Sequence, residues 1–438
     1  MSSHSLSSSD NIPLRDIHTP DSSIASSDFS HLLSEDGEGD EDDDGLPPVD
    51  GGLHAWRCLL GCWLIEFMLW GFPLSFGIFQ SYYSTHPLFA SSSSIPTIGT
   101  LATGLSYLGM PFANLLALRW PYHRRLMCAL GFTLCVLGLL GASFATQTWH
   151  LLLCQGVLYG TSWVVCYTPF LFMLNEWFEE KRGLAYGILF AAGGVGGLVV
   201  PLTVGSLMQR FGFRVALRVF AIATLVVGGT GLLMIKPRIP PGGRRNTVHK
   251  KSGKWAGLKQ VLRDTHFPIF ATAIFLQGLG FFLPNIFLPA FAVDLSLPST
   301  AGSGLLALVS ASQVLGQVGL GWISDKLNPY IPTSAAAFIS GLSVLFLWAP
   351  SKTMSGLTPF AILWGLFSAS YSVSYSQVCN FLVDDPDMVM TIYGVLSFER
   401  GVANILEGPI SAFLLGDAVK VDAYALGRWC GHVFATKN

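Results

Sequence analysis

Eleven apolar runs follow one another along the chain, separated by short stretches that carry charges, Pro or Ser. Each run has roughly 19–29 residues, enough to cross a hydrocarbon core of about 30 Å as an α-helix. The pattern therefore predicts an all-α polytopic membrane protein. The predicted helices cover residues 55–80, 95–118, 126–146, 149–173, 184–208, 215–235, 267–292, 302–323, 331–349, 356–381 and 388–416.

Both ends of the chain depart from this pattern. Residues 1–54 are rich in Ser and Asp, with an acidic run at 35–44, which predicts a disordered tail without the apolar region of a signal peptide. After Asp417 no apolar run is long enough to span, so a twelfth helix is expected to be missing or cut short. Two alternatives follow. The chain is a truncated version of a longer protein, or it works with eleven helices.

Basic residues are concentrated in alternate loops. The loops on one side hold Arg119, Arg124, Arg125, Lys181, Arg182, Lys326 and nine basic residues between Lys236 and Arg263. The loops on the other side hold Arg210, Arg214 and Lys352. This asymmetry follows the positive-inside rule and predicts a cytoplasmic N-terminus. We expect the plasma membrane as the default location, with the vacuolar membrane as the alternative.

The longest loop, residues 236–266, divides the predicted helices into six in residues 55–235 and five in residues 267–438. Within it, apolar residues from Trp255 to Leu262 recur at helical spacing. This predicts either a short helix on the membrane surface or a merely solvated basic loop. The two halves also resemble each other, since helices 95–118 and 302–323 both end in a charged turn. Unless that similarity is due to chance, it indicates a transporter built from two bundles around a midplane site.

Composition excludes other classes of protein. Of the 438 residues, 51% are hydrophobic and 12% are charged, whereas a soluble domain carries about 25% charged residues. No catalytic triad, paired-His spacing or phosphate loop occurs, so we predict no enzyme activity, metal, cofactor or nucleic-acid partner. The eight cysteines form no CxxC pair, and we interpret even Cys58 and Cys62, one helical turn apart, as reduced packing residues.

Two charges are predicted to lie deep in the membrane. Glu66 is about 15 Å along the first helix from Trp56, near the bilayer midplane, where an acid costs about 2.5–3.5 kcal/mol and needs a partner or a wet cavity. Arg400 lies at a similar depth, about 18 Å into the last predicted helix. We hypothesise that Arg400 binds an anion or balances charge, and that Glu66 loads and releases a proton. The alternative is a structural ion pair of Arg400 with Glu66 or Glu399.

Several motifs carry a family resemblance. They are the start at Asp50, Gly51, Gly52 and Trp56; the run from Trp70 with Gly71, Ser75 and Gly77; the segment with Lys181, Arg182, Gly183 and Gly187; and the turn with Gly321 and Asp325. From about Asp50 to Asp417 the chain resembles the monocarboxylate transporter family, fungal type, of the major facilitator superfamily. The resemblance implies two six-helix bundles with solute binding between them and access alternating across the membrane. Members of that family typically move short-chain monocarboxylates, many of them with a proton.

The glycines from Gly183 to Gly197 have the spacing that lets a neighbouring helix approach closely. This close contact would either slide during transport or pack statically, and the sequence leaves both alternatives open.

The chain also departs from that family. Proton-linked members carry a Lys where this chain has Leu74, and an Asp and an Arg where it has Gln313 and Gln317. An amide side chain does not titrate, so the proton-coupled mechanism of the family cannot be transferred to this chain.

We predict a secondary active transporter of small organic anions, with monocarboxylates as the first choice. The partners are the lipid bilayer and a small solute, with or without a proton. The alternatives are a carrier of a neutral or larger solute without proton coupling, and a membrane sensor or scaffold that transports nothing. Core packing is the alternative role of each aromatic candidate. The predicted substrate-binding residues are Glu66, Tyr159, Trp163, Gln277, Asn285, Gln313, Gln317, Tyr371 and Arg400.

Overall fold

The computed structural model describes residues 47–90, 92, 94–239, 261–263, 266–298, 300–369, 371–383 and 385–415. Most of the predicted N-terminal tail, most of the predicted surface helix before Leu262, and the segment after Leu415 lie outside these ranges.

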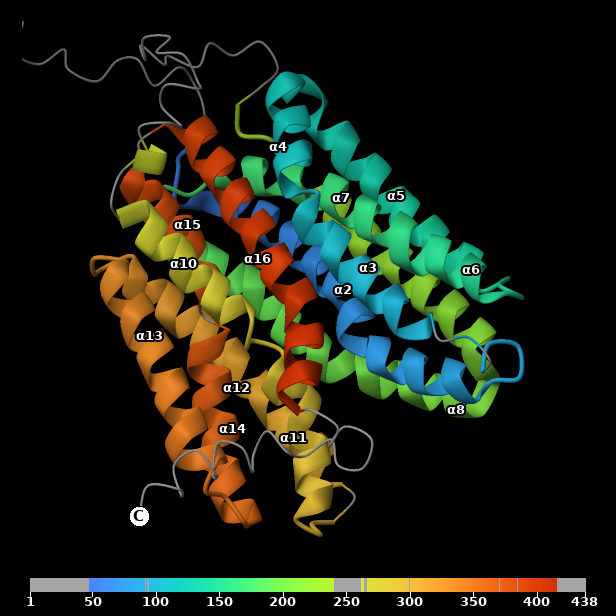
Figure 1. The fold of residues 1–438 in the computed structure, drawn as a ribbon. Coiled ribbons are helices and arrows are strands. Elements are labelled where there is room, and N and C mark those ends of the chain that lie inside the picture. Colours follow the sequence, from blue (N-terminus) through green and yellow to red (C-terminus); the bar gives the residue numbers. More distant parts are fainter. Residues whose placement is uncertain are drawn as a thin grey trace, which may run out of the picture. The chain divides into compact units, whose positions relative to one another are not determined.

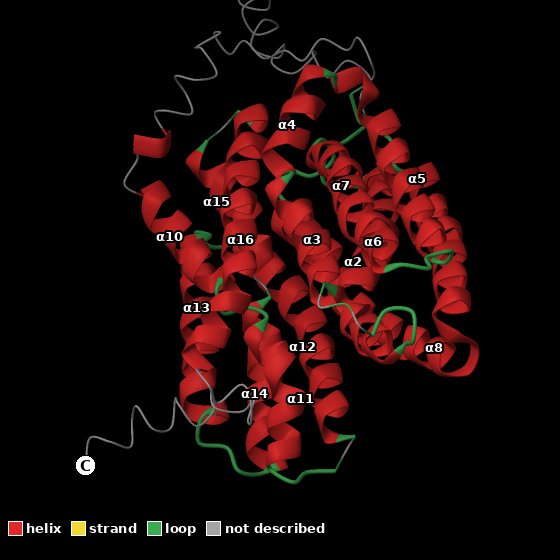
Figure 2. Cartoon of the chain, turned by 45° about the vertical axis from the view of Figure 1, so that its right-hand side comes forward, coloured by secondary structure: helices red, strands yellow, loops and turns green. Residues whose placement is uncertain are grey.

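The described residues form helices and no strand, which confirms the predicted all-α architecture (Figures 1 and 2). The first half contains α2 (Gly52–Thr85), α3 (Ile95–Leu108), α4 (Met110–Arg119), η1 (Pro121–His123), α5 (Arg124–Ala142), α6 (Thr148–Leu151), η2 (Leu152–Leu158), α7 (Tyr159–Asn175) and α8 (Arg182–Met234). The second half contains α10 (His266–Gly278), α11 (Leu283–Asp294), α12 (Ala301–Ser324), α13 (Tyr330–Ser343), η3 (Val344–Trp348), α14 (Met354–Ser368), α15 (Tyr371–Leu382) and α16 (Pro386–Leu415).

Within the described ranges, eight helical segments are long and apolar enough to cross a membrane, and the bent pair α3 and α4 would make a ninth. Segment α8 has 53 residues and contains two of the predicted helices. Helix α16 is not among the apolar spans, and it carries Glu399, Arg400 and Glu407 within its 30 residues.

Gly212 divides α8 into its two parts. Its backbone has φ 77° and ψ 172°, a conformation outside the helical region that side chains with a Cβ rarely adopt. The sequence predicts a loop of several residues between helices 184–208 and 215–235. The structure instead reverses the chain at this single glycine.

Two other predicted helices are interrupted. The α3–α4 pair bends by 42° next to Gly109, where Pro111 has no N–H to donate to the preceding turn. The predicted span 267–292 is present as one apolar span, Phe267–Asp294, but its helix is interrupted, because α10 ends at Gly278 and α11 begins at Leu283. Pro284 occupies the first turn of α11, where its missing N–H leaves no intrahelical bond unmade.

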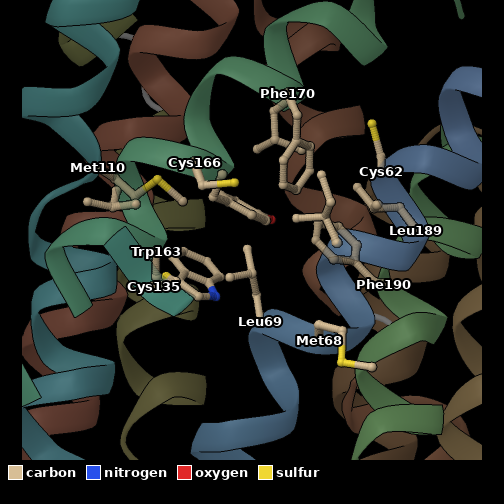
Figure 3. Packing of buried hydrophobic residues seen from close by; sticks show 14 of the residues in the cluster. Cys62, Met68, Leu69, Met110, Cys135, Trp163, Cys166, Phe170, Leu189 and Phe190 are labelled. Atoms are coloured by element: carbon tan, nitrogen blue, oxygen red, sulfur yellow. The ribbon is translucent and has the colours of Figure 1, made fainter. Parts of the chain in front are cut away.

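In Figure 1 the helices α2 to α8 are grouped beside the helices α10 to α16, and we call these two groups the first and the second bundle. Figure 3 shows part of the packing in the first bundle, where Leu69, Trp163, Phe170 and Leu189 lie together. The seven described cysteines are free, and six of them are fully buried. The bundles meet where α8 contacts α12 and where α16 contacts α3 and α4.

The backbones approach closely at both junctions between the bundles. A Cβ on Gly187 would lie 2.4 Å from the carbonyl oxygen of Gln317, and a Cβ on Gly401 would lie 2.7 Å from the Cβ of Tyr107. The predicted close approach along Gly183 and Gly187 is therefore made to α12. Gly77, another motif residue, has open space around its Cα and so has no such packing role.

Candidate functional site: a polar cavity between the bundles

A cavity of about 80 Å³ lies between the two bundles. Residues from α2, α3, α4, α7 and α8 of the first bundle surround it, together with residues from the break between α10 and α11 and from α11, α12, α15 and α16 of the second. Its lining consists of Glu66, Trp70, Leu74, Tyr107, Met110, Trp163, Tyr167, Phe190, Gly193, Phe281, Phe282, Asn285, Gln313, Gln317, Ser372, Tyr375, Tyr393, Ser397 and Arg400. Both deep charges predicted from the sequence therefore reach the same space.

Glu66 lies in the middle of α2 and is fully buried. The indole N–H of Trp70, one helical turn later, donates a hydrogen bond of 2.8 Å to Oε1 of Glu66. The other carboxylate oxygen, Oε2, has no hydrogen-bond partner among the described residues. An unpaired buried oxygen is costly, so Oε2 is the atom available to a proton or a polar group of a solute.

Arg400 lies on α16 with 2% of its surface exposed. Its Nη1 donates to Oε1 of Gln277 at 2.7 Å and to the hydroxyl of Tyr375 at 2.9 Å. Its guanidinium carbon lies 4.8 Å from the centroid of the Phe281 ring. Nε has no hydrogen-bond partner among the described residues, so the cation keeps a free donor beside the cavity.

Arg400 forms no ion pair within 4.0 Å with either acid proposed from the sequence, Glu66 or Glu399, in the described part of the chain. The structural ion pair that the sequence allowed is therefore not formed. Arg400 is held instead by the neutral oxygens of Gln277 and Tyr375.

Aromatic side chains make up much of the cavity wall. Trp163 stacks on Tyr167 with ring centroids 4.3 Å apart, and Trp70 meets Trp163 edge-on at 5.6 Å. The hydroxyls of Tyr167 and Tyr393 lie 3.4 Å apart and join the two bundles. Rings arranged in this way can contact a flat apolar body.

The cavity contains six of the nine predicted substrate-binding residues. They are Glu66, Trp163, Asn285, Gln313, Gln317 and Arg400. Leu74 lies there as well, so all three positions at which the resembled family carries charges face the cavity without a charge. The charged side chains that line this cavity are those of Glu66 and Arg400.

The other three predicted residues do not line the cavity. Tyr159 donates to the carbonyl oxygen of Leu69 at 2.7 Å and packs inside the first bundle. Gln277 lies behind Arg400 and holds it. Tyr371 stacks on the ring of Phe270. Each of these three side chains therefore supports the structure around the cavity.

The sequence analysis missed several lining residues, among them Tyr107, Tyr393 and Ser397. A signal was present for two of them, because Tyr393, Ser397 and Arg400 recur at intervals of four and three residues and so share one face of α16. Tyr107 had no comparable signal. It lies near the end of α3, and only the packing of α3 against α16 brings it to the cavity.

Three of the predicted motifs, the start at Asp50, the segment with Lys181 and the turn with Asp325, meet away from the cavity, at the end of the bundles hereafter called the Asp50 end. The carboxylate of Asp50 accepts backbone N–H groups of Glu179, Glu180 and Lys181 at 2.8–2.9 Å. Those residues immediately precede α8, whose first N–H groups have no acceptor within the helix. The start motif and the motif at the beginning of α8 thus form one capped structure.

A second carboxylate reaches the same helix start from the other bundle. Asp325, which follows α12, accepts the N–H groups of Gly183 at 2.6 Å and Leu184 at 2.8 Å. Gln377 of α15 donates to the same carboxylate at 2.7 Å. We call this contact of Asp325 with Gly183 and Leu184 the Asp325 contact. Burial raises the pKa of the Asp325 carboxyl above its ordinary value, although these hydrogen bonds oppose the shift.

We expect the Asp325 contact to become more populated as the pH falls. A carboxyl whose pKa is raised in the contact binds a proton more readily there than in water. The stability that this effect adds to the Asp325 contact is therefore fully present below the ordinary pKa of Asp, and it is lost as the pH rises through the raised pKa. The measurement is the distance between spin labels at Glu180→Cys and Asn328→Cys, which are exposed positions on the two bundles, with the native cysteines replaced by alanine.

Asp325→Asn should remove this dependence on pH. Asp294→Asn, an exposed change elsewhere in the second bundle, should preserve it. A distance distribution of the unsubstituted chain that stays the same from about pH 4 to pH 8 would contradict the assignment.

The fold and the cavity define a class of protein, namely a polytopic membrane transporter whose two bundles surround a polar site at their junction. The chain belongs to the Major Facilitator Superfamily, whose family model matches residues 54–406. It is therefore a multi-pass integral membrane protein of a transporter family, which supports its classification as a non-enzyme.

Fungal transporters are similar to this chain. An MFS transporter, asaE, of Aspergillus flavus is 30% identical over 391 residues, covering 88% of this chain and 86% of its own length. The aspyridones efflux protein apdF of Emericella nidulans is 28% identical over 378 residues, covering 85% of this chain and 74% of its own. Both matches extend through the two bundles.

A solved structure has the same fold. The human organic anion transporter MFSD10 (TETRAN) superposes with a TM-score of 0.63 at 15% identity, covering 87% of this chain and 98% of that one. At this identity the likeness shows the fold alone. The narrower resemblance to monocarboxylate transporters remains a prediction.

Proposed function

We propose that this protein is a secondary transporter that exports an organic anion with an aromatic or conjugated body. The observation that carries the proposal is Arg400, a buried cation without a carboxylate partner, beside an aromatic cavity. A carboxylate or enolate could bind the free side of the guanidinium, and the rings of Trp163 and Phe281 could contact the rest of the solute.

Two relatives support export. Besides the aspyridones efflux protein, the fujikurins efflux protein of Gibberella fujikuroi is 28% identical over 326 residues. The names of both proteins state efflux. Export across the plasma membrane is accordingly the proposed direction and location.

The proposed orientation places the Asp50 end in the cytoplasm. Lys181 and Lys326 both lie at that end, as does Lys236, whose carbonyl accepts the Trp177 indole N–H. Basic residues at one end of a bundle support a cytoplasmic location for that end. The Asp325 contact would then close the cytoplasmic side, and its release would admit solute from the cell.

A short monocarboxylate is the second candidate. The cavity of about 80 Å³ is smaller than the about 300–1,000 Å³ typical of sites for drug-sized ligands. A larger solute therefore requires the bundles to separate further, whereas a small acid needs less movement. This volume and the motifs of the monocarboxylate family favour the small acid.

Transport into vesicles containing the purified chain would separate these candidates. We expect 2-naphthoate to be moved about tenfold or more faster than 2-naphthylmethanol, because the neutral alcohol lacks the charge-assisted hydrogen bonds to Arg400. Faster movement of L-lactate than of 2-naphthoate would favour the short monocarboxylate. Equal rates for naphthoate and its alcohol would indicate a carrier of neutral solutes, and no movement of any of the three compounds would exclude the proposal for these solute classes.

A second arm of the same experiment tests proton coupling through Glu66. An ionised Glu66 would repel an anion at Arg400, so a proton on Oε2 would favour anion binding and the two would move together. A pH gradient should therefore drive accumulation of 2-naphthoate. Glu66→Gln should keep exchange of labelled for unlabelled naphthoate and lose the response to the gradient. An unchanged response in that variant would assign the proton to another group.

A further inference from the structure

The break between α10 and α11 lies directly against α16. Residues 279–282 are not helical, and α11 begins again at Leu283. The two sides of this break expose unlike partial charges, since the end of α10 presents unpaired carbonyls and the start of α11 presents unpaired N–H groups. Such groups need partners inside a membrane bundle.

Glu407 of α16 meets the start of α11. Its Oε1 accepts the backbone N–H of Phe282 at 3.0 Å, and the N–H of Leu283 also interacts with the carboxylate. The side chain is 4% exposed. A carboxyl oxygen at the N-terminus of a helix supplies an acceptor for backbone N–H groups that have no acceptor within the helix.

Arg400 meets the other side of the break from the same face of α16. It precedes Glu407 by two helical turns, and it holds Gln277 in the last turn of α10. Between these contacts, a Cβ on Gly278 would lie 2.8 Å from the Cβ of Ala403, so the glycine permits close approach. A cation therefore lies near the C-terminal end of α10, and a carboxyl acceptor lies at the N-terminal end of α11, so each side of the break has a partner suited to its unpaired backbone groups.

The residues within the break form part of the cavity wall. Phe281 and Phe282 line the cavity, and their rings meet edge-on at 5.0 Å. Phe281 also covers the Arg400 guanidinium. The position of the break therefore sets the surface that a solute bound at Arg400 would contact.

We propose that Glu407 is a positioning residue that fixes the start of α11 and thereby places Phe281 and Phe282 against the Arg400 site. Glu407 does not touch the solute in this assignment, because it does not line the cavity. The assignment deepens the proposed function and rests on it for the identity of the bound anion. The arrangement of the break itself is a separate property that can be measured without any solute.

Two measurements on the full chain in lipid nanodiscs test the proposal. The first is hydrogen exchange of the amides of Phe282 and Leu283, which we expect to be about fivefold faster in Glu407→Gln, because an amide has one acceptor oxygen where the carboxyl group has two. The second is the affinity for 2-naphthoate, followed by quenching of tryptophan fluorescence. We expect this affinity to weaken about three- to tenfold in Glu407→Gln and to recover partly in Glu407→Asp. The reason is that fewer molecules would hold Phe281 and Phe282 in the position that binds the anion.

Glu399→Gln is the matched control. Glu399 is a half-buried acid on the same helix, next to Arg400, that does not line the cavity, so its loss should change neither readout. Unchanged exchange in Glu407→Gln would overturn the proposal, and so would faster exchange with unchanged affinity. Binding by the unsubstituted chain without transport would overturn the proposed function and leave this assignment in place. If the unsubstituted chain does not bind 2-naphthoate, hydrogen exchange of the amides of Phe282 and Leu283 alone tests whether Glu407 fixes the start of α11.

Discussion

Arg400→Ala is expected to lower the transport of 2-naphthoate about 30-fold or more at equal amounts of protein in the membrane. The change removes a buried cation and also leaves Gln277 and Tyr375 without their hydrogen-bond donor. Truncating one partner of a buried charged interaction typically costs about 2–5 kcal/mol, and 1.4 kcal/mol corresponds to tenfold. The measurement is initial transport rate across a range of naphthoate concentrations.

Two further variants distinguish charge from geometry at this position. Arg400→Lys keeps the cation and loses the planar fork, so we expect an intermediate loss. Arg210→Ala removes an exposed arginine of the first bundle and should leave transport unchanged. Wild-type transport of naphthoate by Arg400→Ala would show that Arg400 balances charge in the bundle without recognising the anion.

Gly321→Ala is expected to prevent the bundles from closing at the Asp50 end and to lower transport about tenfold or more. A Cβ on Gly321 would lie 2.4 Å from the carbonyl oxygen of Gly183. The contact would join a Cβ to a backbone oxygen, so rotation of a side chain cannot relieve it. Overpacking of a tight contact costs about 1–3 kcal/mol, enough to depopulate the closed state if it lies within a few kcal/mol of the open one.

Gly319 supplies the control two residues away on the same helix. Nothing lies within 4 Å of a Cβ placed there, so Gly319→Ala should change neither transport nor the distance between labels at Glu180 and Asn328. In Gly321→Ala the label distance should lengthen as transport falls. A lengthened distance with normal transport would mean that α8 and α12 pack there without taking part in the transport cycle.

Much of the helical content could be predicted from the sequence because a bilayer requires long apolar runs. The helix limits of α12 and α13 with η3 lie within a residue or two of those predicted. The interruptions were harder to predict. Gly278 and Pro284 are compatible with a continuous or a broken helix, and the acceptor found at the break is Glu407 of α16, which is 125 residues away from Phe282 in the chain.

Some residues of the candidate site could likewise be predicted from the sequence, and others could not. Glu66 and Arg400 could be selected because a charge at mid-depth in an apolar run is costly wherever the helix faces. Tyr159 and Tyr371 could not be separated from true lining residues, because an aromatic residue suits both a core and a cavity wall. Tyr107 was missed, because its role depends on the close approach of α3 and α16.

The sequence by itself determined the length and number of the apolar runs, the asymmetry of the basic loops, and the presence of unlike charges at mid-depth, since these follow from the local cost of placing residues in lipid. Only the tertiary structure decided that Arg400 is held by Gln277 and Tyr375, that Asp325 reaches the start of α8, and that Glu407 meets α11. These contacts join residues far apart in the chain. They depend on the rotation and spacing of packed helices, which the order of residues along one helix does not specify.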